Sequence, residues 1–256
     1  MSTNSDDRVV ADVKSINCYA QHIARRSEVR DQIRYYLRPT RSGVTVVSTD
    51  AKTPMCGFTG WNGQGEIPWK TVTSVADPQK KPEKRVQAQL IRMALEHERR
   101  LPAVFAPTGT VWFLVDEFVA QTGDSVKDSV RGDMIGIWEV DGAIRPAFIE
   151  IKWDRQADTL KKQINKMYTT FFNDSAKRRL QALHDLATTV LGRPLPPWSP
   201  TGARALGVMV WPQCVSPRRK TPGKTDLGAG RELQVVGYND GWPDHELTFV
   251  HESSLA

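Results

Sequence analysis

One stretch of the chain, residues 132–153, constrains the fold most because its pattern predicts a β-hairpin. Asp133 opens the first expected strand, and the Asp-Gly pair at 141–142 is strongly favoured in tight hairpin turns. The second strand is expected at 146–153. The hairpin therefore brings Asp133 to the same place as the charged residues near the end of the second strand.

The second expected strand carries two ionisable side chains on one face. Successive side chains of a strand point to opposite faces, so Glu150 and Lys152 share a face with Phe148, whereas Ile149 and Ile151 point away from it. Two interpretations follow. The two charges form an exposed ion pair of the kind that is common on antiparallel sheets, or they belong to a site that needs both.

A metal-dependent enzyme that hydrolyses phosphodiester bonds needs both kinds of charge. Carboxylates are preferred ligands of Mg²⁺ and Mn²⁺, and such a cation polarises the phosphate and makes hydroxide available from bound water. A lysine beside the metal can orient the water, help to deprotonate it, or stabilise the negative charge of the transition state. On this interpretation Asp133 and Glu150 bind the metal and Lys152 is the catalytic lysine.

An acid at 133 followed by Glu150-Ile151-Lys152 resembles the active-site pattern of the PD-(D/E)XK nuclease superfamily. Gly132 stands where that pattern has proline, and the resemblance covers roughly residues 80–212 without pointing to a subfamily. It implies a restriction-endonuclease-like α/β fold, with a mixed central sheet flanked by helices. It also implies an Mg²⁺- or Mn²⁺-dependent nuclease that cuts within DNA, with restriction or phage defence as the preferred roles.

The core of that superfamily runs helix, three antiparallel strands, helix and a further strand, and the patterning of this chain agrees. Residues 80–100 predict the first helix, and 110–121 predict a buried strand that precedes the hairpin. Helices are expected at 154–173 and 174–191, and the next strand is expected at 204–212.

The two ends of the chain are less regular. Residues 8–38 predict one long helix or two shorter helices that end before Pro39. We expect a helical N-terminal extension at 1–77, for DNA contact or dimerisation, and a nuclease domain at 78–256. Further strands are expected at 44–48, 231–238 and 245–251, with a mobile basic loop at 213–230 that could enter the DNA groove.

Two other polar residues could contribute to the site. Some members of the superfamily add an acid from the first helix, and Glu83 is the better candidate for such a ligand; an acid in a first helical turn also suits the helix dipole without any metal. Gln163 resembles a glutamine of RecB-like members, although Tyr168 follows it by five residues and not by four. Gln163 could hold Lys152 or contact a phosphate, or simply border the apolar stripe of its helix.

The formal net charge of +6 permits a polyanionic partner such as DNA. Charge runs are often solvated helix faces, but the expected chemistry favours phosphate contacts here. The residues expected to contact nucleic acid are Lys80, Lys81, Lys84, Lys161, Lys162, Arg218, Arg219 and Lys220.

Composition restricts the remaining possibilities. No apolar run approaches the ~20 residues needed to cross a bilayer, so no membrane partner is expected. The three cysteines form no zinc or disulfide pattern, and the expected compartment is the reducing cytoplasm. DNA, a second copy of the chain and a larger nucleoprotein complex are the expected partners. A non-cutting nucleic-acid-binding or assembly subunit of the same fold, and an RNA-directed nuclease, stay open as alternatives.

Overall fold

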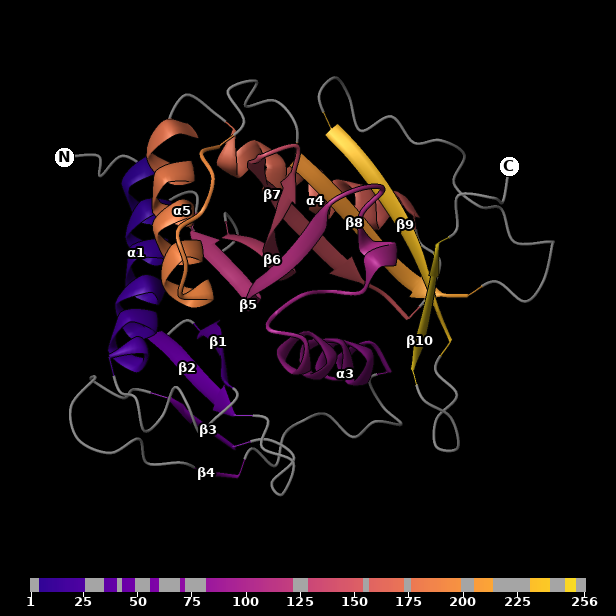
Figure 1. Ribbon diagram of the computed structural model, residues 1–256, viewed down its shortest axis with the longest axis horizontal. Coiled ribbons are helices and arrows are strands. Elements are labelled where there is room, and N and C mark those ends of the chain that lie inside the picture. Colours follow the sequence, from indigo (N-terminus) through magenta and orange to yellow (C-terminus); the bar gives the residue numbers. More distant parts are fainter. Residues whose placement is uncertain are drawn as a thin grey trace.

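The structure is a computed structural model of the 256-residue chain. It describes residues 5–25, 35–40, 43–48, 56–59, 70–71, 82–121, 129–153, 157–172, 176–198, 205–213, 231–239 and 247–251. These residues form α-helices and one mixed β-sheet, which confirms the α/β class expected from the sequence (Figure 1). None of the described helices is long and apolar enough to span a membrane.

Ten described strands make up the sheet. They are β1 (Tyr35–Thr40), β2 (Gly43–Ser48), β3 (Cys56–Thr59), β4 (Lys70–Thr71), β5 (Thr110–Gln121), β6 (Ser129–Val140), β7 (Ala143–Ile151), β8 (Ala205–Pro212), β9 (Arg231–Asn239) and β10 (Thr248–His251). Their order in the sheet is β10-β9-β8-β7-β6-β5-β1-β2-β3-β4. At the centre β5, β6 and β7 are antiparallel, while β8 joins β7 in parallel.

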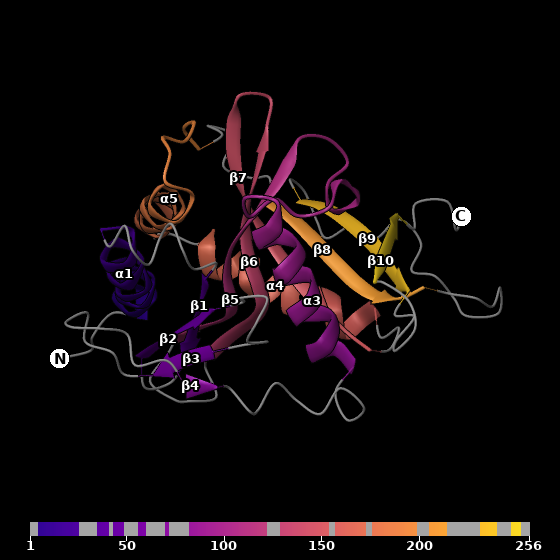
Figure 2. The same cartoon turned by 60° about the horizontal axis from the view of Figure 1, so that its bottom comes forward.

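Helices cover both faces of this sheet. They are α1 (Ser5–Ala24), α3 (Pro82–Glu96), α4 (Ala157–Phe171) and α5 (Ala176–Leu191), and a short 3₁₀ turn spans Ala103–Phe105. Buried residues of α3 pack on one face, and buried residues of α1, α4 and α5 pack on the other. Figure 2 shows α3 crossing in front of the sheet with α4 behind it. The central sheet is therefore flanked by helices, as expected.

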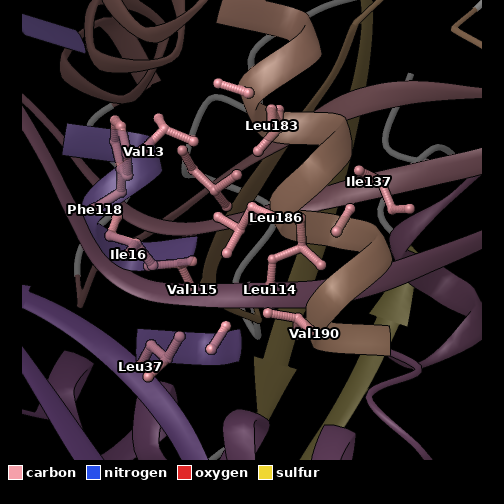
Figure 3. Packing of buried hydrophobic residues seen from close by; sticks show 14 of the residues in the cluster. Val13, Ile16, Leu37, Leu114, Val115, Phe118, Ile137, Leu183, Leu186 and Val190 are labelled. Atoms are coloured by element: carbon pink, nitrogen blue, oxygen red, sulfur yellow. The ribbon is translucent and has the colours of Figure 1, made fainter. Parts of the chain in front are cut away.

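The N-terminal helix shares a hydrophobic core with the rest of the chain. Helices α1 and α5 lie side by side in both cartoon views (Figures 1 and 2). Buried side chains of the two helices meet over β5 (Figure 3). The division of the chain between residues 77 and 78 stays a prediction, although described elements on both sides of it contribute to this core. Buried residues of this core labelled in Figure 3 include Val13, Ile16, Leu37, Leu114, Val115, Phe118, Leu183, Leu186 and Val190.

The hairpin forms around the turn that the sequence predicts. Asp141 and Gly142 have φ angles of 52° and 70°, the positive values that a type I′ turn requires at both positions. The expected strand limits were wrong: β6 begins four residues before Asp133, because its pairing with β5 continues to Ser129 and Gln121. Strand β7 begins at Ala143 and ends at Ile151, so Lys152 follows the strand.

Two expected helix limits also differ from the structure. The sequence predicted one long helix or two shorter helices over 8–38. Helix α1 ends at Ala24, and residues 26–34 lie outside the described residues. The end of that expected helical stretch was wrong, because residues 35–40 form β1, which pairs with β2 and, at Leu37, with Val115 of β5. The helix expected at 80–100 ends at Glu96, because Glu98 and Arg99 adopt left-handed φ angles of 54° and 71°. The basic loop expected at 213–230 lies outside the described residues after position 213.

Candidate active site

A cavity of about 320 Å³ lies at the ends of β5, β6 and β7, between α3 and α4. Six of the nine residues that line it are polar, and they comprise three carboxylates, two cationic side chains and one amide. The polar residues are Lys84, Glu117, Arg131, Asp133, Glu150 and Gln163. This cavity contains two of the three acids predicted to bind the metal, Asp133 and Glu150.

The structure brings Asp133, Glu150 and Lys152 together. The Lys152 ammonium nitrogen lies 3.7 Å from Asp133 Oδ2 and 3.8 Å from Glu150 Oε2. The Ile151 main-chain N–H donates a hydrogen bond to Asp133 Oδ2 at 2.8 Å. The alternation expected on the strand is also present, because Phe148 packs toward α4 and Ile149 packs toward α3.

The backbone of Lys152 is held by the strands beside it. Its N–H donates to the Val210 carbonyl on β8 at 2.9 Å. Its carbonyl accepts a hydrogen bond from the Tyr238 hydroxyl on β9 at 3.3 Å. The lysine therefore extends from a fixed main chain, even though it follows the last residue of β7.

Glu150 is a buried carboxylate with little to stabilise its charge. Only 1% of the residue is exposed, and neither carboxylate oxygen has a hydrogen-bond partner. Burial, and then the negative charge of Asp133, raise the pKa of Glu150 well above its ordinary value, while Lys152 partly opposes that rise. Burying such a group is costly unless it meets a counter-charge. A bound cation would supply that counter-charge.

The residues present fit a hard divalent cation. Within the described ranges, no three Asp, Glu, His or Cys side chains are close enough to form a metal-binding group. Mg²⁺ needs fewer, because it commonly binds one or two carboxylates and completes its shell with water and substrate phosphate. Asp133 and Glu150 provide two carboxylates, and the buried Oε1 atom of Gln163 on the same cavity also lacks a hydrogen-bond partner.

The other selected residues are placed differently. Glu83 is half-buried in the first turn of α3 and does not line the cavity, whereas its neighbour Lys84 does. On α4, Lys161 is half-buried and Lys162 is exposed. The structure does not describe the remaining five basic residues, which are Lys80, Lys81, Arg218, Arg219 and Lys220.

Sequence reasoning missed two charged residues of the cavity, Glu117 and Arg131. The Lys84 ammonium nitrogen lies 2.7 Å from Glu117 Oε1 and 3.8 Å from Asp133 Oδ1, so it connects the missed acid to the selected one. Burial lowers the pKa of Lys84, but the negative charges of Asp133 and Glu117 outweigh burial and raise that pKa above its ordinary value. One signal was available, since Asp116 and Glu117 interrupt an otherwise apolar strand.

Comparisons with known proteins give no independent guide to this site. No protein-family model, no curated protein and no solved structure has a significant match to the chain. The geometry of the cavity therefore carries the functional argument.

Proposed function

We propose that this chain is a metal-dependent nuclease that hydrolyses phosphodiester bonds in DNA. One observation carries the proposal: the Lys152 ammonium lies 3.7 Å and 3.8 Å from the carboxylates of Asp133 and Glu150, which line one cavity. A buried carboxylate that has no hydrogen-bond partner and lies beside a second acid and a lysine is costly for folding and suited to binding a cation.

The arrangement of the elements supports a restriction-endonuclease-like scaffold. Helix α3 precedes three antiparallel strands, and α4 and α5 lead to β8, which joins β7 in parallel. This is the order expected from the resemblance to PD-(D/E)XK nucleases. The acids come from adjacent strands, which gives them a rigid base.

The side chains at the cavity would have different roles in cleavage. Asp133 and Glu150 would hold Mg²⁺ or Mn²⁺, which when bound lowers the pKa of a water molecule and polarises a phosphate. Lys152 would orient the attacking water and stabilise the negative charge that develops on the phosphate. Lys84 and the exposed Arg131 would bind phosphate oxygens at the cavity.

The first experiment is cleavage of supercoiled plasmid and single-stranded DNA with Mg²⁺, Mn²⁺ or EDTA. Three variants are compared with the wild type: Asp133→Asn, Lys152→Met and the control Lys14→Met, which changes an exposed lysine on α1. We expect metal-dependent nicking or linearisation of plasmid by wild type and Lys14→Met, and none by the other two variants. Equal cutting by all four proteins would reject the site.

The same assay separates the alternatives. Salt-sensitive DNA binding without cleavage, unchanged in Lys152→Met, would identify a non-cutting binding or assembly subunit. Cleavage of RNA but not of DNA would identify an RNA-directed nuclease. Nicking of circular plasmid would establish internal cleavage, which a role in restriction requires.

A further inference from the structure

Asp116 is a buried acid outside the cavity that the proposed chemistry does not use. The residue is fully buried, with 0% exposure. Its carboxylate accepts one hydrogen bond from Arg38 Nε of β1 at 2.6 Å and another from Gln87 Nε2 of α3 at 2.5 Å. Both carboxylate oxygens are therefore engaged, one by the N-terminal part of the chain and one by α3.

Gln87 connects this buried acid to the active site. Its Nε2 atom also donates to the main-chain carbonyl of Asp133 at 2.9 Å, and its Oε1 atom accepts from the Lys84 ammonium at 2.9 Å. A carboxylate and a carbonyl can only accept, and an ammonium can only donate. One orientation of the Gln87 amide therefore satisfies all three partners, and the carboxylate of Asp116 selects that orientation.

The charge of Asp116 is in turn held by Arg38. The guanidinium is half-buried, lies 5.8 Å from the ring centre of Tyr36 and donates to the Tyr36 hydroxyl at 3.4 Å. A planar guanidinium held in this way is a more rigid partner for a carboxylate than a flexible ammonium. The hydrogen bonds thus run from β1 through Asp116 and Gln87 to Asp133.

Resting on the proposed nuclease function, we propose that Gln87 is a positioning residue of the active site, oriented by Asp116 and Arg38. It fixes the main chain of the metal ligand Asp133 and the ammonium of Lys84. Strand β1 then contributes to positioning the site, through Arg38. Groups that orient metal ligands typically contribute 10–100-fold to metal affinity or activity, although they do not touch the metal.

The test uses variants of the full chain that keep the size of each side chain. Gln87→Met removes both the donor and the acceptor of the Gln87 amide. Asp116→Asn replaces the carboxylate that accepts from Gln87 Nε2 by an amide, so the orientation of the Gln87 amide is selected less strongly. Gln89→Met is the matched control, because Gln89 lies on α3 and its Oε1 atom has no hydrogen-bond partner. Circular dichroism and urea unfolding establish that each variant folds. The readouts are Mn²⁺ affinity by calorimetry without DNA, and kcat and KM for DNA cleavage.

We expect Gln87→Met and Asp116→Asn to bind Mn²⁺ more weakly and to lose roughly 10–100-fold in kcat, with KM for DNA little changed. Gln89→Met should match wild type in both. Wild-type Mn²⁺ affinity and kcat in a folded Gln87→Met protein would overturn the positioning role alone. A wild-type protein that neither binds Mn²⁺ nor cuts would overturn the nuclease proposal, and this inference with it. If Gln87→Met fails to fold, unchanged Mn²⁺ affinity in Asp116→Asn would overturn the inference instead.

Discussion

The main chain of Ile151 donates a hydrogen bond to the side chain of Asp133, with a distance of 2.8 Å between N and Oδ2. The main-chain pairing of β6 and β7 ends at Met134 and Ile149. Beyond that pair, the hydrogen bond from Ile151 to the Asp133 side chain links the two strands. Because Ile151 stands between Glu150 and Lys152, the bond fixes the Asp133 carboxylate relative to both of them.

This bond separates two roles of Asp133. Asp133→Asn keeps an oxygen that can accept from Ile151 but removes the charge, whereas Asp133→Ala removes both. We expect both variants to lose cleavage. In urea unfolding with EDTA, the alanine variant should be less stable than the asparagine variant by about 1 kcal/mol, the usual contribution of one such hydrogen bond. Equal stability of the two variants would show that the bond contributes nothing to the fold.

Glu150→Gln should stabilise the protein while abolishing cleavage. Burial raises the folded-state pKa of Glu150, so the native state loses stability relative to the unfolded state as the pH rises above the ordinary pKa of 4.5. Removing the charge should raise the free energy of unfolding at pH 8 in EDTA by at least about 1 kcal/mol, because Lys152 recovers only part of the desolvation penalty. Near pH 4 the gain should disappear.

The same substitution at Glu139 gives the matched control for Glu150→Gln. Glu139 Oε2 accepts hydrogen bonds from Arg193 at 2.5 Å and from the Trp112 indole at 2.8 Å, so its negative charge stabilises the folded state. Glu139→Gln should leave cleavage intact and lower stability slightly. A lower free energy of unfolding for Glu150→Gln at pH 8 would contradict the view that the buried charge of Glu150 destabilises the folded protein.

The sequence was most informative where partners are close along the chain. The turn at 141–142 fixes the hairpin, and the hairpin alone brings Asp133 near Glu150 and Lys152. Helix α5 was likewise predictable, because its apolar stripe is regular and Gly192, with a φ of 63°, follows its end.

Distant partners explain what the sequence did not predict. The helical spacing near residue 37 was overridden by pairing with strands of the sheet, including a parallel partner at Val115. Arg38 and Asp116 are 78 positions apart, and only that pairing brings them together. Gln87 reaches Asp116 only because α3 packs on β5, and no local sequence pattern predicts that contact.

Asp116 should leave a signature in the pH dependence of stability. Burial raises its pKa from 3.8 to about 6, although Arg38 and Lys84 oppose the rise and Glu117 adds to it. Between these pH values the native state binds more protons than the unfolded state, so wild-type stability should fall as the pH rises from about 4 to about 6. Asp116→Asn lacks this loss.

Urea unfolding of wild type and Asp116→Asn from pH 4 to pH 7 measures the effect. The stability of the variant relative to wild type should increase by up to about 1.4 kcal/mol per pH unit within that window and then stay constant. Because Glu150 is present in both proteins, its own titration cancels in the difference. A relative stability that decreases with rising pH would mean that Arg38 holds the pKa of Asp116 below its ordinary value.

Gly132→Ala tests whether the space beside Glu150 is needed for a cation. A Cβ atom at 132 would lie 3.1 Å from Met167 Cε and 3.5 Å from Glu150 Oε1. The flexible methionine can move, so the free energy of unfolding should change by no more than about 1 kcal/mol. The methyl group would nevertheless occupy room that a hydrated ion needs, and Mn²⁺ affinity by calorimetry should fall roughly tenfold.

In contrast, a Cβ at Gly136 would overlap the main-chain oxygen of Trp112, so Gly136→Ala should impair folding itself. A folded Gly132→Ala protein with wild-type Mn²⁺ affinity would place the cation away from Glu150 and would reject the assignment of that residue as a ligand.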